Sequence, residues 1–400
     1  MTPAIIVIGY NRPDSLKRLL NSLNKAFYPK SVNPTLIISL DKCDDDATAK
    51  AAEEFNWEHG EKRVVLKSKR LGLKKHVLSC GDYTEEFGSI IVLEDDLLVS
   101  PAFYEYSMKA LDFTDGDDRI GGVSLYNHLF NVHVRESFCA LFDGYDNWYF
   151  QLASSWGQAY TKSQWEGFKN WLLKYSDSDK TAELNNRMKT DPRLPANVSG
   201  WSDKSWLKYY IFYLVDTNRY FMYPQISYTT NFGDVGSHMK KADTDLQVPI
   251  SLDAKSLYLQ FSTLDNSNSV YDAYFENTKL SDKLVCGNTM ICDLYGSKPL
   301  AELSVNADYI LSSTPLKFKA VKSFGRMMRP HDANIFYEIP GDDFYLYEIN
   351  KDEINKGIVK SSKASSKTPA QKWFYQYRGI SAAQMLDMLR YRINEKITRK

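Results

Sequence analysis

The chain has 400 residues, of which 43% are hydrophobic and 25% are charged, and its formal net charge at pH 7 is zero. This is the composition of a globular protein with enough apolar residues for a core, and the length suggests two or three structural units. A neutral chain does not favour nucleic acid as a partner, and the sequence lacks the apolar run of about 18 residues that a transmembrane helix needs. The five scattered cysteines favour a reduced, cytoplasmic setting.

Short apolar runs alternate with amphipathic stretches over the first hundred residues. The runs predict four strands buried on both faces of a parallel sheet, at Ile5–Ile8, Leu36–Leu40, Val64–Leu66 and Ile90–Leu93. Apolar residues at helical spacing predict helices over Ser15–Phe27, Ala47–Phe55 and Leu73–Tyr83. Strands and helices in alternation indicate an α/β fold with right-handed crossovers.

Polar clusters follow three of these predicted strands. They are Tyr10-Asn11-Arg12, Asp41 and its neighbours, and Glu94-Asp95-Asp96. Ligands of open α/β sheets bind beyond the carboxyl ends of the strands, so we expect these clusters to converge on one binding edge. The sequence contains neither a glycine-rich dinucleotide motif nor a P-loop, which argues against those enzyme classes.

The acidic triplet Glu94-Asp95-Asp96 has two interpretations. A solvated turn, or the start of a helix near Ser100-Pro101, would explain it without any function. Alternatively, carboxylate oxygens suit Mg²⁺ or Mn²⁺, and such an ion binds substrate phosphates and neutralises a diphosphate leaving group.

The composition changes between about Tyr126 and His238, where six of the eight tryptophans lie between Trp148 and Trp206. This pattern predicts the acceptor-binding half of an enzyme. We therefore divide the chain into a first, ligand-binding half (1–125), an acceptor and catalytic half (126–245), a C-terminal extension (246–345) and a basic amphipathic tail (346–400).

The tail is strongly basic. Residues 351–400 hold twelve Lys and Arg against four Asp and Glu, a net charge of +8, and four apolar residues lie four apart on one helical face: Met385, Leu389, Ile393 and Ile397. A solvated end and a partner-docking helix are two interpretations. We favour a third, a helix drawn to an anionic membrane surface, which would make the protein peripheral on the inner face of the membrane.

Further segments keep the order and spacing of a known family from residue 5 to about 240. They are Val92–Leu97, Pro101–Tyr106, Val123–Asn127, Ser154–Ala159, Gly200–Trp206 and Tyr223–Ser227. Together with the three polar clusters they resemble the GT-A glycosyltransferase superfamily. More narrowly, the chain is similar to the Golgi N-acetylglucosaminyltransferase I family and its bacterial relatives among family-2-like sugar transferases. The resemblance implies a mixed, mainly parallel GT-A sheet flanked by helices, with residues 1–125 as its nucleotide-sugar-binding half.

The resemblance also implies a function. It is metal-dependent transfer of a sugar from a nucleotide sugar, with UDP as the nucleotide, to a hydroxyl of a glycan or a lipid-linked acceptor. Asp96 would bind Mn²⁺ or Mg²⁺ directly, and Asp203 would be the general base of an inverting reaction. The family often has two adjacent acids at the base position, whereas here Ser202 replaces one of them.

Donor contacts are implied for a second set of residues. Glu94 and Asp95 would face the sugar and ribose, Asp41 would bond the uracil edge, and Arg12 would lie near the base or the diphosphate. The remaining candidates on the nucleotide side are Tyr10, Asn11 and His76.

Two further features each have a structural and a functional interpretation. His238 follows a glycine-rich turn, and it is either structural or a second metal contact. Tryptophan belongs mostly to cores, but Trp156, Trp201 and Trp206 lie beside small polar residues, which favours stacking against acceptor sugars.

Two other functions compete with glycosyl transfer. One is a catalytically silent carbohydrate-binding or assembly subunit, and the intact Glu94, Asp95, Asp96, Asp41 and Asp203 count against it. The other is a sugar nucleotidyltransferase, which needs a Gly- and Lys/Arg-rich loop near the N-terminus, where the segment Gly9–Ser15 offers only Arg12.

Overall fold

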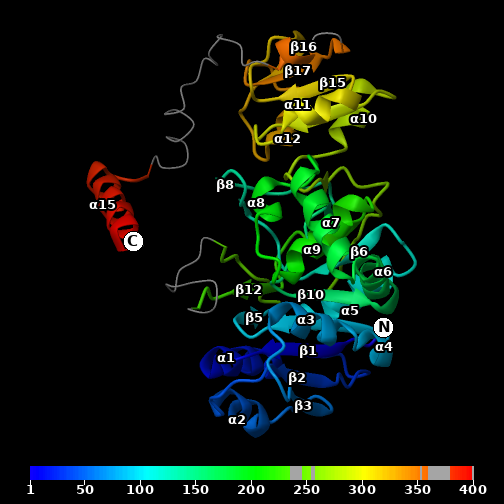
Figure 1. Ribbon diagram of the computed structural model, residues 1–400, viewed down its shortest axis with the longest axis vertical. Helices are drawn as coiled ribbons and strands as arrows, with labels where there is room; N and C mark the ends of the chain where they lie inside the picture. The colour runs from blue at the N-terminus through cyan, green and yellow to red at the C-terminus, as the bar shows by residue number, and fades with distance from the viewer. Residues whose placement is uncertain (235–245, 254–256, 352–353, 359–378, 399–400) are drawn as a thin grey trace.

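A nine-stranded sheet forms the centre of the molecule in the computed structural model, which describes residues 1–234, 246–253, 257–351, 354–358 and 379–398 (Figure 1). Its strand order is β13-β9-β11-β6-β10-β4-β1-β2-β3. In chain order the strands are β1 (Ala4–Gly9), β2 (Leu36–Leu40), β3 (Lys62–Leu66), β4 (Ser89–Glu94), β6 (Ile120–Ser124), β9 (Asn147–Phe150), β10 (Gln158–Thr161), β11 (Tyr220–Pro224) and β13 (Val270–Tyr271).

The four strands predicted at the N-terminus are confirmed. β1 pairs in parallel with β2 and β4, and β2 pairs in parallel with β3. All residues of β1 and β2 are buried, as expected for strands covered on both faces. β3 differs from the prediction because it is the edge strand of the sheet, and Leu66 at its end is 50% exposed.

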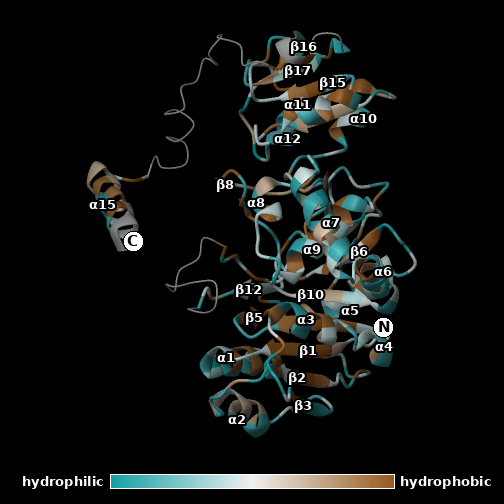
Figure 2. Cartoon of the chain, in the orientation of Figure 1, coloured by the Kyte–Doolittle hydropathy of each residue, from teal (hydrophilic) through white to brown (hydrophobic). Residues whose placement is uncertain are grey.

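Helices cover both faces of the sheet. Alternate residues of a strand point to opposite faces, so Ile5 and Val7 pack in one core and Ile6 and Ile8 in the other. The first face is covered by α1 (Pro13–Asn24), α2 (Ala47–Glu54) and α5 (Phe103–Thr114), and the second by α3 (Leu73–Gly81), α6 (Lys162–Leu173) and α9 (Trp206–Asp216). Figure 2 shows the apolar strands β1 and β2 in brown.

The predicted helices at the N-terminus are also confirmed, although α1 begins two residues before the predicted start and all three helices end one to three residues before the predicted ends. In α1 the four leucines at helical spacing, Leu16, Leu19, Leu20 and Leu23, are completely buried. Each buried leucine contributes about 1.5–3 kcal/mol, so this stripe anchors the helix to the sheet more firmly than helix propensity alone.

The second half of the sheet is mixed. β10 runs antiparallel to both β4 and β6, while β11 is parallel to β6 and antiparallel to β9. β13 is parallel to β9, although it comes from the segment predicted as a C-terminal extension. The sheet is therefore mixed and mainly parallel, and the predicted α/β class is confirmed.

Shorter elements surround this body. Two small antiparallel pairs join β5 (Leu97–Val99) to β12 (Thr229–Asn231) and β7 (Phe130–Asn131) to β8 (Glu136–Ser137). The remaining helices of the body are α4 (Thr84–Phe87), α7 (Ser178–Thr190) and α8 (Ala196–Ser199).

A second, four-stranded sheet with its own core lies beyond the main body (Figure 1). Its order is β14-β15-β17-β16, from β14 (Met290–Asp293), β15 (Tyr309–Ser312), β16 (Lys319–Phe324) and β17 (Phe344–Glu348). The helices beside it are α10 (Leu280–Val285), α11 (Leu300–Leu303), the 3₁₀ turn η1 (Ser304–Asn306) and α12 (His331–Phe336). Polar contacts attach this unit to the body, for example Arg326 to Glu136 at 2.9 Å.

The basic tail contains the helix that the apolar spacing predicts. After the short α13 (Ile354–Gly357) comes α15 (Ala382–Thr398), and every residue of α15 whose side chain is described is exposed. Within the described ranges, no helix is both long and apolar enough to cross a membrane.

Candidate active site

Three predicted clusters do converge on one edge of the main sheet. Tyr10-Asn11-Arg12 follows β1, Asp41 follows β2, and Glu94 ends β4. Because these strands are parallel and Ile8 pairs with Glu94, their carboxyl ends lie side by side. The edge predicted to bind a ligand therefore carries the predicted polar residues.

Arg12 neutralises part of the acidic triplet. Its Nη1 donates to Oδ2 of Asp96 at 3.0 Å, and its Nη2 forms an ion pair with Asp95. The Asp95 carboxylate is only 3% exposed and also accepts a hydrogen bond from the backbone of Tyr10. One guanidinium between two carboxylates lets adjacent acids coexist in a partly buried place.

Asp96 has the atom that best fits a metal ion. Its Oδ1 is buried and has no hydrogen-bond partner among the described residues, whereas buried polar atoms are normally paired. No group of three potential protein ligands forms within the described ranges. Mg²⁺ commonly binds through one or two carboxylates and takes its other ligands from substrate phosphates and water, so Asp96 fits an ion that arrives with a diphosphate.

Glu94 links the triplet to the second half of the body. Burial, and then the carboxylates of Asp96 and Asp95, raise the pKa of Glu94 above its usual range, while Arg12 and a hydrogen bond from Trp206 oppose the shift. Trp206 is the first residue of α9 and is 2% exposed. The indole of Trp206 therefore bonds to Glu94, and its buried ring does not present a face to an acceptor sugar.

Asp203 lies just before α9, close to this contact. Its carboxylate is 64% exposed and accepts a hydrogen bond from Nζ of Lys208 at 2.9 Å. Lys208 is buried, and the same Nζ donates to the carbonyl of Trp201 at 3.0 Å. Trp201 itself is 36% exposed, so it is the tryptophan of this segment that presents a ring to solvent.

Asp41 fastens the loop before α3. Its Oδ1 accepts the backbone N–H groups of Lys42 at 2.9 Å and Leu71 at 2.8 Å, and its Oδ2 accepts that of Gly72 at 2.9 Å. Gly72 has a positive φ of 75°, which a residue with a side chain rarely adopts. The carboxylate of Asp41, which is predicted to bind a nucleobase, thus also holds the loop at Leu71 and Gly72 in place.

His76 is enclosed under the same loop. It is 2% exposed, its Nε2 lies 2.8 Å from the hydroxyl of Ser39, and burial lowers its pKa to about 4. In this conformation a neutral imidazole faces the strand β2 and not the solvent.

The remaining predicted residues differ in their access. Asn11 is exposed, and the guanidinium of Arg70 lies 4.5 Å from the ring centroid of Tyr10. Trp156 is partly buried, with its ring 4.7 Å from that of Tyr126, and it precedes β10, whose Gln158 pairs with Val92. This register brings Trp156 to the same edge as Glu94. His238 lies outside the described residues.

Sequence reasoning missed a clamp between α1 and the segment after β12. The backbone N–H of Phe232 donates to the carbonyl of Asp96 at 3.1 Å, and the guanidinium of Arg18 lies 3.8 Å from the Phe232 ring centroid. Asp234 forms an ion pair with Arg18 and accepts a hydrogen bond from Ser15 at 2.7 Å. Residues 18 and 234 are 216 positions apart, and no local pattern in the sequence couples them.

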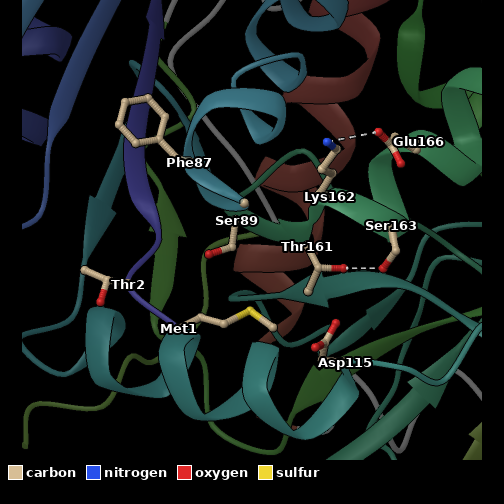
Figure 3. Close-up of a pocket in the computed structure, with 10 residues that line it drawn as sticks. Met1, Thr2, Phe87, Ser89, Asp115, Thr161, Lys162, Ser163 and Glu166 are labelled. Carbon is tan, nitrogen blue, oxygen red and sulfur yellow. Dashed lines mark hydrogen bonds and ion pairs between the residues drawn. The ribbon is translucent and has the colours of Figure 1, made fainter.

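A hollow at the opposite edge of the sheet contains none of the predicted site residues (Figure 3). It is lined by Thr2, just before β1, by the start of β4 at Ser89 and by the end of β10 at Thr161. Asp115 also lines the hollow, and its other charged side chains, Lys162 and Glu166, form an ion pair at 3.7 Å. We therefore place the candidate site at the carboxyl edge.

The sequence is 24% identical over 309 residues to an Arabidopsis thaliana protein named alpha-1,3-mannosyl-glycoprotein 2-beta-N-acetylglucosaminyltransferase. The match covers 72% of this chain, and the chain spans 60% of the length of that relative. No protein-family model matches the chain.

Two solved structures are similar to parts of this chain. TarS from S. aureus, residues 1–349 in complex with UDP-GlcNAc, has a TM-score of 0.38 at 16% identity, covering 61% of this chain and 62% of that one. The mannosyltransferase PcManGT from Pyrobaculum calidifontis, in complex with GDP-Man and Mn²⁺, has a TM-score of 0.30 at 15% identity, covering 43% and 47%. The sequence match to the Arabidopsis protein confirms the resemblance to the N-acetylglucosaminyltransferase I family.

Proposed function

We propose that this chain is a metal-dependent, inverting glycosyltransferase that moves a sugar from a UDP-sugar to a hydroxyl of a glycan or a lipid-linked acceptor. The observation that carries the proposal is the buried Oδ1 of Asp96 at the carboxyl edge of the sheet, which has no hydrogen-bond partner in the described part of the chain. The name of the Arabidopsis relative, an N-acetylglucosaminyltransferase, supports the same class of reaction.

The donor would lie along the edge from Asp41 to the triplet. One wall of the donor site would consist of the three residues after β1, which are Tyr10, Asn11 and Arg12. The guanidinium of Arg12 would exchange Asp96 for a phosphate and keep its ion pair with Asp95. A divalent ion bound at Asp96 would neutralise the charge that develops on the diphosphate leaving group. Glu94 and Asp95 then face the sugar and ribose hydroxyls.

The acceptor hydroxyl needs a base on the other side of the sugar. Asp203 would take the proton, because its carboxylate is exposed and Lys208 holds it in place. The sugar carbon has oxocarbenium character in the transition state, and attack from the face opposite the leaving group inverts the configuration. Trp201 and Trp156 would line the acceptor side.

The test measures donor hydrolysis and transfer separately. With Mn²⁺ present, we expect slow hydrolysis of one sugar nucleotide in a screen of UDP-, GDP- and CMP-sugars. Asp203→Asn should keep the affinity for the nucleotide and lower turnover about 10²–10⁴-fold, the usual contribution of a positioned base. Asp179→Asn, an exposed change on α7, is the matched control.

Two results would count against these roles. Full activity of Asp203→Asn removes it from the mechanism, and Asp216 and Asp234 become the next candidates. Asp216 is already bonded to Trp171 and Arg187, and Asp234 to Ser15, so both would first have to exchange partners. Absence of hydrolysis of every sugar nucleotide would favour a silent binding subunit.

The tail completes the proposal. We assign residues 351–400, through α15, to an anionic membrane surface, which would keep the protein near a lipid-linked acceptor.

A further inference from the structure

Two lysines from different helices meet beside Asp203. Lys74 belongs to α3 and Lys208 to α9, and these helices pack against one another. Nζ of Lys74 lies 3.4 Å from the ring centroid of Tyr209, while Nζ of Lys208 lies 2.9 Å from Asp203. The cluster therefore holds two ammonium groups against one carboxylate.

The charges of the two lysines are not balanced equally. Lys208 is satisfied by the carboxylate of Asp203 and the carbonyl of Trp201. Lys74 has no hydrogen bond or salt bridge to any described residue, and its ammonium group lies over the face of Tyr209. Burial, and also the charge of Lys208, lower the pKa of Lys74 to about 8, while Asp203 partly opposes this. A half-buried cation without a partner favours an added anion.

The place of the cluster indicates the acceptor side of the site. Trp206 starts α9 and donates to Glu94, so the cluster adjoins the triplet through the first turn of that helix. Arg12 and Oδ1 of Asp96, which has no partner among the described residues, would serve a metal-bound diphosphate. Lys74 instead lies near Asp203, and Lys208 joins Asp203 to the backbone carbonyl of Trp201, whose side chain is partly exposed. Asp203 and Trp201 are the residues that would meet an acceptor sugar.

We propose that Lys74, Asp203 and Trp201 form an acceptor subsite for a sugar that carries an anionic group, a phosphate or a carboxylate. The sugar ring would stack on Trp201, a hydroxyl would bond to Asp203, and the anionic group would pair with Lys74. This inference rests on the proposed function, and it adds the chemical class of the acceptor.

The experiment compares matched sugars on the full chain. Binding of glucose 6-phosphate, glucuronate and glucose is measured by NMR titration for the unchanged protein, Lys74→Met and Lys75→Met. Lys75 is the exposed neighbour on α3, so its substitution removes the same charge without touching the cluster. We expect the two anionic sugars to bind about tenfold more tightly than glucose, as one charge-assisted contact would give. Lys74→Met should lose this preference, and Lys75→Met should keep it.

Three results would overturn the inference. They are no preference for the anionic sugars in the unchanged protein, an equal loss in Lys75→Met, and a parallel loss of UDP affinity in Lys74→Met, which would assign the lysine to the donor. Because Lys74 packs on Tyr209, Lys74→Gln is measured as well, and Lys74→Arg should restore the preference.

The failure of this inference is separable from that of the proposed function. Metal-dependent hydrolysis of a sugar nucleotide tests the enzyme without any acceptor. A protein that hydrolyses the donor but ignores the charge of the sugar keeps the proposed function and loses the subsite.

Discussion

Two buried clusters of acidic side chains in this protein are each stabilised by a single basic residue. In the triplet, one arginine joins two carboxylates. Where the body meets the second unit, the buried side chain of Lys298 forms an ion pair with Asp272, while Glu276 is completely buried close by. One cation cannot neutralise all the acids around it, so protons must make up the difference.

Glu276 should therefore link stability to pH. Burial, followed by the charge of Asp293, raises the pKa of Glu276 well above 4.5, so the folded protein holds a proton that the unfolded chain releases. Stability from this proton is complete below pH 4.5 and declines as the pH rises. Glu276→Gln should flatten the fall of the melting temperature as the pH rises above 4.5, in thermal scans at constant ionic strength. Parallel curves for both proteins would contradict this.

Asp96 should control the response to metal. Asp96→Ala removes the unpartnered Oδ1 and the contact with Arg12, so Mn²⁺ should no longer increase the affinity for UDP. Calorimetric titration of UDP with and without Mn²⁺ measures this, with Asp179→Ala as the control. An unchanged metal effect in the variant would refute the assignment of Asp96.

The sequence predicted the positions of these residues better than their partners. A β-branched run followed by three acids is a local pattern, so the triplet could be placed at the end of a strand. The contacts of Arg12 with Asp95 and Asp96 join residues 83 and 84 positions apart, which only the fold brings together. The same holds for Trp206, whose burial follows from the packing of α9 and not from its polar neighbours.

Elements with strong periodicity were the most predictable. β1, β2, β4 and the leucine stripe of α1 follow their patterns, because burial on two faces or one face requires those patterns. The four-stranded sheet was not predicted, since strands such as β14 and β15 have only four residues each. Runs so short give no clear period, and their pairing depends on distant segments.

The helix α15 carries a prediction of its own. Its exposed apolar residues include Leu389 at 54% and Ile393 at 57%, and the tail around it has a net charge of +8. The full chain should co-sediment with vesicles that contain phosphatidylglycerol and not with pure phosphatidylcholine, and added salt should weaken the binding.

Two variants separate the apolar face from the charge. A chain ending at residue 359 should lose sedimentation entirely, and the double change Leu389→Ser with Ile393→Ser should lose most of it while the charge stays the same. Equal sedimentation of the shortened chain would end the assignment to a membrane surface.

At the scale of the whole molecule, the main body extends past the predicted boundary at residue 246. β13 completes the sheet beside β9, and its residues Val270 and Tyr271 are each 2% exposed. Ala273 and Phe275 pack in the core that also contains Tyr271. The body is therefore finished by residues that sequence composition assigned to a separate extension.

Two truncations test this extent. A chain ending at residue 359 keeps both sheets and α13, with Ile354 and Ile358 packed against the core of the second unit, and we expect it to unfold at nearly the same temperature as the full protein. A chain ending at residue 245 lacks β13, so β9 loses one of its two neighbours and both cores lose buried side chains. Its cooperative unfolding transition, measured by circular dichroism, should disappear. A cooperative, unshifted transition for the shorter chain would show that β13 is dispensable.

The strand order also has a consequence for the growing chain during translation. β1, β2, β3 and β4 are neighbours in the sheet and come from residues 4–94, so this side can assemble while synthesis is still under way. The free edge of β4 stays unpaired until β10 at residues 158–161 has been synthesised, and one edge of β9 stays unpaired until β13 at residues 270–271 has been synthesised. A pause in translation between these points would therefore leave an unpaired strand edge exposed on the nascent chain. Such edges promote aggregation unless a chaperone covers them.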